Sequence, residues 1–127
     1  MENKRLEMFT EFYRVLDQWM TLKEQHKDVD EILAKNGYHK IAVYGMGSMA
    51  LHFIEALKGS DITLEYAIDK NPNFYTDVII KTPDQELDEV DVIIYTNKFE
   101  SKRNLEELRQ KVDCPLICLS DVVFDNL

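Results

Sequence analysis

The chain has 127 residues, of which 24 are acidic and 15 are basic, so its formal net charge is −9. This length suits one domain with one core and is too short for a nucleotide-binding domain plus a separate substrate domain. The excess of acid lies in residues 41–127, and the sequence offers no basic face of the kind that nucleic acids and anionic membranes require.

Residues 4–25 predict one long amphipathic helix rather than a signal peptide or a membrane span, and we therefore expect a cytoplasmic protein. The apolar side chains fall in two adjacent stripes at helical spacing: Leu6, Phe9, Tyr13, Leu16 and Met20, and beside them Met8, Phe12, Val15, Trp19 and Leu22. Together they cover an arc of roughly 200°, about twice what a surface helix needs. We expect one stripe to pack on its own domain and the other either to form a homodimer through helix 4–25, which we favour, or to pack on a further part of the core.

The rest of the chain alternates between strand and helix patterns. In chain order we expect a helix over 28–35, a strand over 40–44, a helix over 48–58, strands over 64–68 and 78–80, a helix beginning within 82–87, a strand over 91–96, a helix over 101–111, a strand over 116–119 and a helical turn over 120–124. This predicts an α/β fold: a Rossmann-like doubly wound parallel five-stranded sheet, in the order 3-2-1-4-5, preceded by the amphipathic helix. Residues 1–36 are expected to form a helical extension and 37–127 a nucleotide-binding domain.

Local signals place the ends and faces of these elements. Asp28 is the expected N-cap of its helix, and Pro83 suits the first turn of the next predicted helix. Ser120 or Asp121 should cap the last helical turn. Cys114 and Cys118 fall in one predicted strand, too far apart for a disulfide, and should be reduced thiols. Within 48–58 the spacing predicts one buried face: Ala50, Leu51, Ile54 and Leu57.

The most informative segment, Gly45-Met46-Gly47-Ser48-Met49-Ala50, reads G-x-G-x-x-A between a strand and a helix. The first glycine permits a tight turn, the second lets the backbone approach a pyrophosphate, and the small third residue lets the helix pack close to the sheet. The N-terminus of the helix offers free N–H groups and the positive end of its dipole to a phosphate, and the Ser48 hydroxyl could add a donor. This pattern predicts a nucleotide-binding loop.

Polar residues that follow the neighbouring strands complete the predicted site. Asp69 ends the second strand, where a carboxylate can accept hydrogen bonds from a ribose diol and would repel a 2′-phosphate, which favours NAD over NADP. Lys70, next to it, weakens that repulsion. Thr96 and Asn97 end the strand on the other side of the expected crevice and are candidates for a second sugar or a nicotinamide. The predicted cofactor-binding residues are Gly45, Met46, Gly47, Ser48, Met49, Asp69, Lys70, Thr96 and Asn97.

No catalytic or metal-binding residues are predicted. Tyr66 and Lys70 have the Y-x-x-x-K spacing of short-chain dehydrogenases, but they fall on a strand and its turn, whereas that chemistry needs a helix. His52 and Glu55 could share a metal as an i, i+3 pair, but two ligands are too few for a protein zinc site.

Four segments carry a resemblance to known families: IAVYGMG at 41–47, AIDKNP at 67–72, TPDQEL at 82–87 and VDVII at 90–94. Residues 40–121 resemble the small Rossmann-type domain that precedes bacterial nucleotide-sugar acetyltransferases. They also resemble the N-terminal CoA-binding-like domain of the nucleotide-sugar dehydratases and epimerases of polysaccharide biosynthesis. The resemblance implies that Gly45, Gly47 and Asp69 contact a nucleotide or nucleotide-sugar. It leaves out helix 4–25, and the catalytic residues of those families have no counterpart here.

Three functions follow from these observations. The first is a module that binds NAD or a nucleotide-sugar in sugar or polysaccharide metabolism, without a catalytic site of its own. The second is a structural or oligomerisation module whose nucleotide site is vestigial and whose glycines serve only packing. The third is a small enzyme, dependent on NAD or S-adenosylmethionine, that a dimer partner completes.

Overall fold

The computed structural model describes residues 2–74 and 76–127. Its helices are α1 (Glu2–Glu24), α2 (Val29–Lys35), α3 (Ser48–Leu57), α4 (Lys102–Lys111) and α5 (Leu119–Asp125). Its strands are β1 (Lys40–Tyr44), β2 (Thr63–Ile68), β3 (Ile80–Lys81), β4 (Val92–Tyr95) and β5 (Leu116–Cys118). The strands pair in parallel in the order β3-β2-β1-β4-β5. The predicted α/β fold, its strand order and its preceding helix are confirmed.

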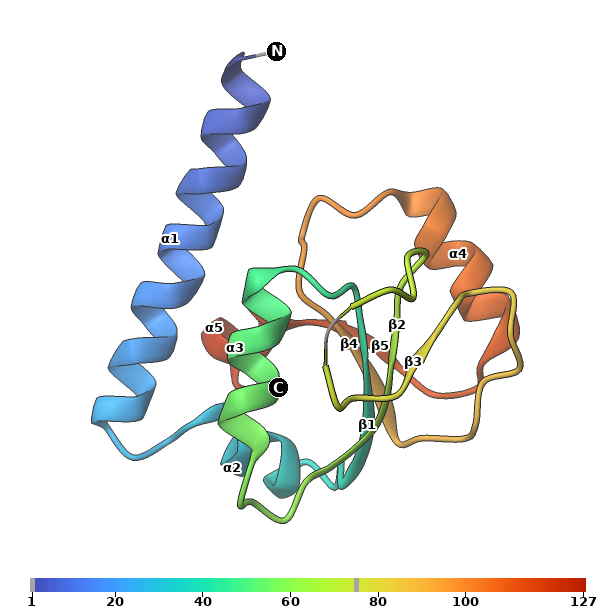
Figure 1. Cartoon of the computed structure of the whole chain (residues 1–127). Helices are drawn as coiled ribbons and strands as arrows, with labels where there is room; N and C mark the ends of the chain where they lie inside the picture. The colour runs from blue at the N-terminus through green and yellow to red at the C-terminus, as the bar shows by residue number, and fades with distance from the viewer. Residues whose placement is uncertain (1, 75) are drawn as a thin grey trace.

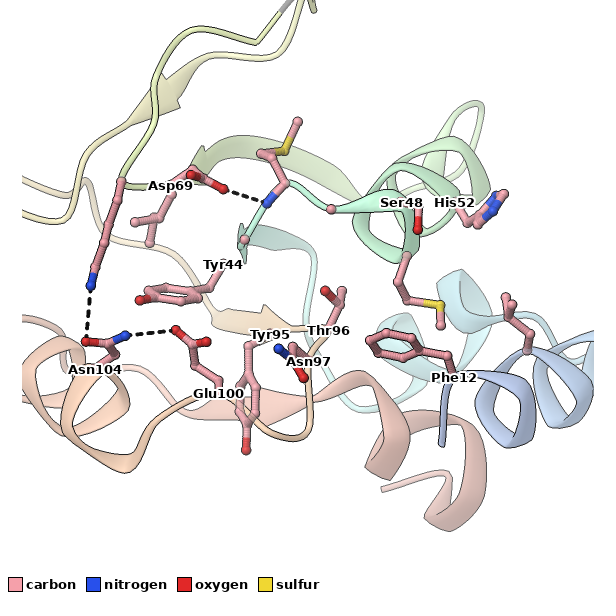
Figure 2. A pocket seen from close by; sticks show the side chains of 17 residues that line it. Phe12, Tyr44, Ser48, His52, Asp69, Tyr95, Thr96, Asn97, Glu100 and Asn104 are labelled. Carbon is pink, nitrogen blue, oxygen red and sulfur yellow. Dashed lines mark hydrogen bonds between the residues drawn. The ribbon is translucent and has the colours of Figure 1, made fainter. Parts of the chain in front are cut away.

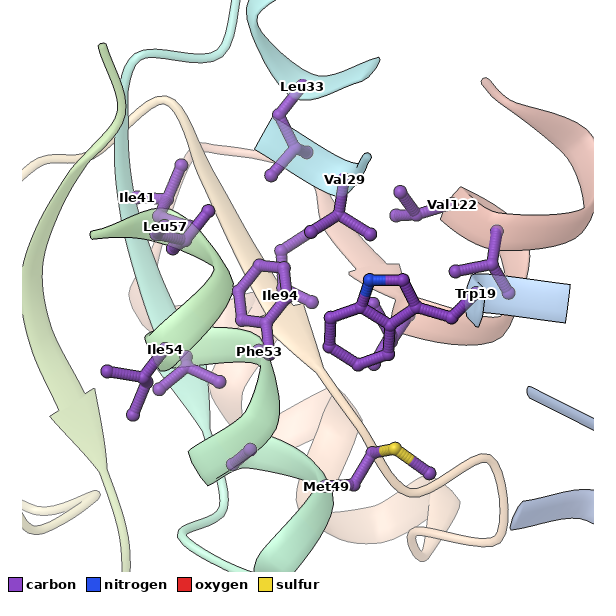
Figure 3. Close-up of a cluster of buried hydrophobic side chains, with 14 of the residues drawn as sticks. Trp19, Val29, Leu33, Ile41, Met49, Phe53, Ile54, Leu57, Ile94 and Val122 are labelled. Carbon is purple, nitrogen blue, oxygen red and sulfur yellow. The ribbon is translucent and has the colours of Figure 1, made fainter. Parts of the chain in front are cut away.

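The two faces of the sheet are covered unequally, as Figure 1 shows. Successive strand residues point to opposite faces, so Ile41 and Val43 of β1 join one hydrophobic cluster while Ala42 joins another. The first cluster lies under α1, α2, α3 and α5 and includes Trp19 and Phe53, whose ring centroids are 6.4 Å apart (Figure 3). The second cluster is smaller and lies under α4. The helices that surround the first cluster therefore supply most of the core.

The helix α1 is fixed to the domain through its C-terminal half. The buried Trp19 donates from Nε1 to Asp28 Oδ1 at 2.8 Å, and the same oxygen accepts from Val29 N at 2.7 Å. Asp28 is thus the N-cap of α2, as predicted, and it also ties α2 to α1. Of the two predicted apolar stripes, the one that contains Trp19 packs on the domain, and the one that contains Phe9 stays exposed.

The edge strand predicted over 78–80 is present but ends one residue later: β3 pairs with β2 at Ile80 and Lys81, and the Ile79 carbonyl accepts from Ala67 N at 2.8 Å. The prediction for the segment that follows is wrong. Residues 82–87 form a turn without a helix. The Gln85 side chain closes this turn by accepting from Thr82 N at 2.7 Å, and Lys111 of α4 donates to the carbonyl groups of Pro83 and Gln85. The two bonds from Lys111 satisfy carbonyl groups that a helix would have used.

Three smaller predictions also need correction. On α3 the buried face includes Phe53, which is fully buried, whereas Leu51 is 51% exposed. Cys114 precedes β5 instead of lying within it, although both thiols are free as expected. The last helix begins at Leu119, one residue earlier than predicted, and its N-cap is Cys118 instead of Ser120 or Asp121. No helix among residues 2–74 and 76–127 is long and apolar enough to cross a membrane.

Candidate functional site

A cavity of about 490 Å³ lies at the carboxyl ends of β1, β2 and β4, where the strand order reverses. Ligands of open α/β sheets bind at this position. The nine residues predicted from the sequence all line it: Gly45, Met46, Gly47, Ser48, Met49, Asp69, Lys70, Thr96 and Asn97. The sequence did not indicate the others: Phe12, Leu16, Tyr44, His52, Ile68, Tyr95, Glu100 and Asn104. Figure 2 shows α3 and α1 on one side of this crevice and α4 on the other.

The two glycines of the loop meet different requirements. Gly45 has φ = +90°, a conformation that other residues rarely adopt, and its N–H donates to the Ile68 carbonyl at 2.8 Å. Gly47 has φ = −77°, which any residue can adopt, and a Cβ there would meet nothing within 4 Å. The backbone fold therefore requires glycine at 45. Neither the conformation nor the packing of this chain requires it at 47.

The N-terminus of α3 faces the crevice without a side-chain cap. Gly47 is its N-cap residue, no acidic side chain lies in its first turn, and Ser48 is exposed. The first N–H groups of a helix have no acceptor within the helix. Ala50 is fully buried against the core, as expected for the small third position of the motif. The crevice thus receives unpaired donors and the positive end of a helix dipole.

Asp69 holds the glycine loop from the end of β2. Its Oδ2 accepts from Met46 N (Figure 2) and its Oδ1 accepts from Asn71 N, both at 2.9 Å. Each carboxylate oxygen can accept a second hydrogen bond. The two backbone donors therefore fix the orientation of the carboxylate and leave it the capacity to accept from a vicinal diol.

The α4 side of the crevice carries a chain of polar contacts. Lys70 Nζ donates to Asn104 Oδ1 at 3.4 Å, and Asn104 Nδ2 donates to Glu100 Oε1 at 3.2 Å. Partial burial of Tyr44 is the main cause that raises its pKa to about 12, and the negative charge of the nearby Glu100 carboxylate is the next largest cause. The hydroxyl of Tyr44 therefore stays protonated. Asn97 accepts from Phe99 N at 2.9 Å, which shapes the loop after β4. The α4 side of the crevice can therefore donate hydrogen bonds to a sugar or a base and accept hydrogen bonds from it.

The α1 side is apolar and was not predicted. Phe12 and Leu16 form this wall beside α3, with the exposed His52 at its rim. A buried carboxylate, Glu11, holds α1 in place: it is 3.7 Å from Lys98 Nζ and accepts from Ser120 Oγ at 3.3 Å. The apolar stripes in the sequence predict that one face of α1 is buried. They do not predict which end of the sheet the helix lies against.

The remaining sequence motifs lie elsewhere or are incomplete. Tyr66 is 1% exposed, and its hydroxyl donates to the Asp88 carbonyl at 2.7 Å, below α4 and away from the crevice. The Y-x-x-x-K spacing therefore does not build a dehydrogenase site. Within the part of the chain that the structure describes, no three His, Cys, Asp or Glu side chains gather as metal ligands.

Comparisons of the chain with models of protein families, with curated proteins and with solved structures found no match.

Proposed function

We propose that the crevice binds a nucleotide that carries a diphosphate and an unphosphorylated ribose, either NAD or a nucleotide-sugar. The N–H groups at the start of α3 bind the diphosphate, and Asp69 accepts from the ribose hydroxyls. Thr96 and Asn97 contact the second half of the ligand. The protein acts as a binding module in sugar or polysaccharide metabolism, as the resemblance of residues 40–121 implies, without a catalytic site of its own.

The observation that carries this proposal is the glycine at position 47. A chain that kept its glycines only for packing would need one at 45, where φ is +90°, and not at 47. A Cβ at 47 would occupy the open space before α3, which is where a phosphate must come within hydrogen-bond distance of the backbone. The presence of glycine at 47, which neither the conformation nor the packing requires, is best explained by a ligand that approaches the backbone there.

Isothermal titration of the purified protein with NAD, NADP, UDP-N-acetylglucosamine, coenzyme A and S-adenosylmethionine tests the proposal. NAD or UDP-N-acetylglucosamine should bind, and NADP should bind more weakly than NAD because its 2′-phosphate meets the Asp69 carboxylate. Removing that carboxylate with Asp69→Ala should weaken binding by about 1.5–3 kcal/mol, the contribution of hydrogen bonds to a charged group.

The control for this experiment is Asp61→Asn, an exposed carboxylate in the connection between α3 and β2, at the opposite end of the strands. It should leave the affinity unchanged. Absence of binding by every compound at millimolar concentration would overturn the proposal. Equal affinities of the parent and of Asp69→Ala would remove Asp69 from the site.

The exposed stripe of α1 supports a second role, association of the chain with itself. Five large apolar side chains on one helix face are between 40% and 69% exposed: Leu6, Phe9, Tyr13, Leu16 and Met20. A contiguous exposed apolar surface of this kind marks an interaction site. The homodimer predicted from the sequence therefore remains part of the proposal, and its geometry is taken up next.

A further inference from the structure

The exposed stripe of α1 has the spacing of a coiled-coil seam. Its members are separated by three, four, three and four residues: Leu6, Phe9, Tyr13, Leu16 and Met20. A regular 3-4 spacing is the pattern with which one helix packs along another helix of similar length. The neighbouring stripe, with Val15, Trp19 and Leu22, is already buried in the core of the same chain. The free seam therefore fits a second helix.

The two halves of this seam have different surroundings. The C-terminal half runs beside α3, and a groove of about 270 Å³ lies between the two helices. The groove is lined by Leu16, Trp19, Met20, Lys23, His52, Glu55 and Ala56. The N-terminal half extends past the rest of the domain (Figure 1), where Leu6, Phe9 and Tyr13 are at least 59% exposed. One molecule thus presents both a projecting apolar ridge and a groove.

A ridge and a groove on the same helix are what a two-fold symmetric contact needs, because each copy must supply both surfaces. If the helices run antiparallel, the ridge of each copy reaches the groove of the other. Centring the contact between Tyr13 and Leu16 places Tyr13 opposite Leu16 of the partner subunit and Phe9 opposite Met20 of the partner subunit. Four of the five seam residues then face apolar side chains, and Leu6 lies opposite Lys23 of the partner subunit, whose aliphatic stem can cover it.

The helix dipoles and one pair of charges favour the same arrangement. In this register Arg5 lies level with Glu24 of the partner subunit, whereas Glu7 faces away from the seam. The symmetry repeats the Arg5–Glu24 pair. A parallel arrangement would instead place Arg5 level with Arg5 of the partner subunit and would align the two helix dipoles. The antiparallel pair opposes the two dipoles, which favours it.

We propose that a second copy of this chain packs antiparallel along α1, with the N-terminal half of each helix in the groove of the other, and closes the open end of the nucleotide crevice. Leu16 and His52 line both the groove and the crevice, so a helix seated in the groove covers the rim that His52 leaves open. The partner's Tyr13, opposite Leu16, supplies an aromatic side chain at this rim. The closure rests on the proposed function, whereas the helix pairing does not.

The oligomeric state is tested by measuring the mass of the full chain in solution by light scattering, from about 5 to 200 μM. The parent should be a dimer at the upper end of this range. The double variant Phe9→Glu/Tyr13→Glu should be a monomer that stays folded, because both side chains are more than half exposed. The control, Leu51→Glu, places a single glutamate on an apolar residue of α3 that is also more than half exposed but lies outside the groove, and it should remain a dimer. A monomeric parent would overturn the inference.

Disulfide formation tests the direction of the pair. The variant Phe9→Cys/Met20→Cys should form covalent dimers under mild oxidation, while Phe9→Cys alone should not. The parent, with its two native cysteines, is the control for background cross-linking. Efficient cross-linking of Phe9→Cys alone would indicate a parallel pair and overturn the proposed register.

Titration of the parent and the monomeric variant with NAD and with UDP-N-acetylglucosamine tests closure of the crevice. Affinity should be at least about tenfold weaker for the monomeric variant, and ligand should increase the dimer fraction of the parent by the same coupling. Equal affinities would overturn the closure. A dimeric parent that binds neither compound would overturn the proposed function and the closure but leave the helix pairing intact, so the two failures are distinguishable.

Discussion

Replacing Gly47 with serine separates what the fold requires from what a ligand requires. Gly47 is the N-cap of α3, has φ = −77°, and leaves open space where a Cβ would lie. Serine is a better N-cap than glycine by a few tenths of a kcal/mol, because its hydroxyl accepts from the N–H groups of the first turn. The variant should therefore unfold at the same temperature as the parent or slightly above it.

The same hydroxyl should weaken nucleotide binding. It would occupy the donors that a phosphate needs and fill the space through which the phosphate approaches. Losing one charge-assisted hydrogen bond costs about 1.5–3 kcal/mol, which corresponds to about a tenfold to hundredfold rise in Kd. Thermal unfolding and isothermal titration with NAD and UDP-N-acetylglucosamine measure the two effects. If Gly47→Ser binds as tightly as the parent, the phosphate does not lie before α3 and the reasoning is refuted.

Gly45→Ala is the matched comparison. At φ = +90° a Cβ costs about 1–2 kcal/mol, so this variant should unfold about 4–8 °C lower even without ligand. We expect Gly45→Ala to lower stability, and Gly47→Ser to lower affinity without lowering stability. This result would assign a structural role to Gly45 and a ligand-binding role to Gly47.

Two further predictions concern the fold. Trp19→Phe removes the 2.8 Å hydrogen bond to Asp28 and part of a buried ring. In a urea titration it should lower the free energy of unfolding by about 2–4 kcal/mol. A loss below about 1 kcal/mol would contradict the anchoring role of Trp19. Hydrogen bonds from Lys40 N and His39 N lower the pKa of Asp91 from its ordinary 3.8, so its stabilising effect is present above that pH and fades as pH falls through the lowered pKa. Asp91→Asn should therefore be less stable than the parent at pH 7, and the difference should shrink as the pH falls below 3.8; a difference independent of pH would refute this.

The glycine loop and the strands beside it could be predicted because local rules govern them. A strand, two glycines and a helix must form a turn, and Asp69 must follow β2 wherever that strand ends. The site residues that the sequence missed depend on long-range packing. Phe12 and Leu16 reach the crevice only because α1 crosses the carboxyl end of the sheet, and Glu100 depends on the path of the loop after β4. No periodicity encodes these placements.

The errors have similar physical causes. Most positions in the first two turns of α3 are apolar. The hydrophobic pattern therefore does not show which side of the helix is buried. The sequence pattern predicts Leu51 inward, but Phe53, about 200° further around the helix, is the residue that reaches the core. After β3, Pro83 is compatible with a helix start, but only one apolar residue, Leu87, follows within a turn. Contacts from Lys111, 28 residues beyond Pro83, stabilise the turn instead.

The short edges of the sheet determine how this molecule can polymerise. The edge strand β3 has two residues, one of them Lys81, and the opposite edge strand β5 has three. Such edges offer few free backbone groups to a neighbouring chain, and a lysine in the strand further disfavours pairing. Growth by strand addition, which has no natural end, is therefore suppressed at both sides. The helix pairing that we propose, with its two-fold symmetry, would end at two copies, so it would give a closed assembly and not a fibre.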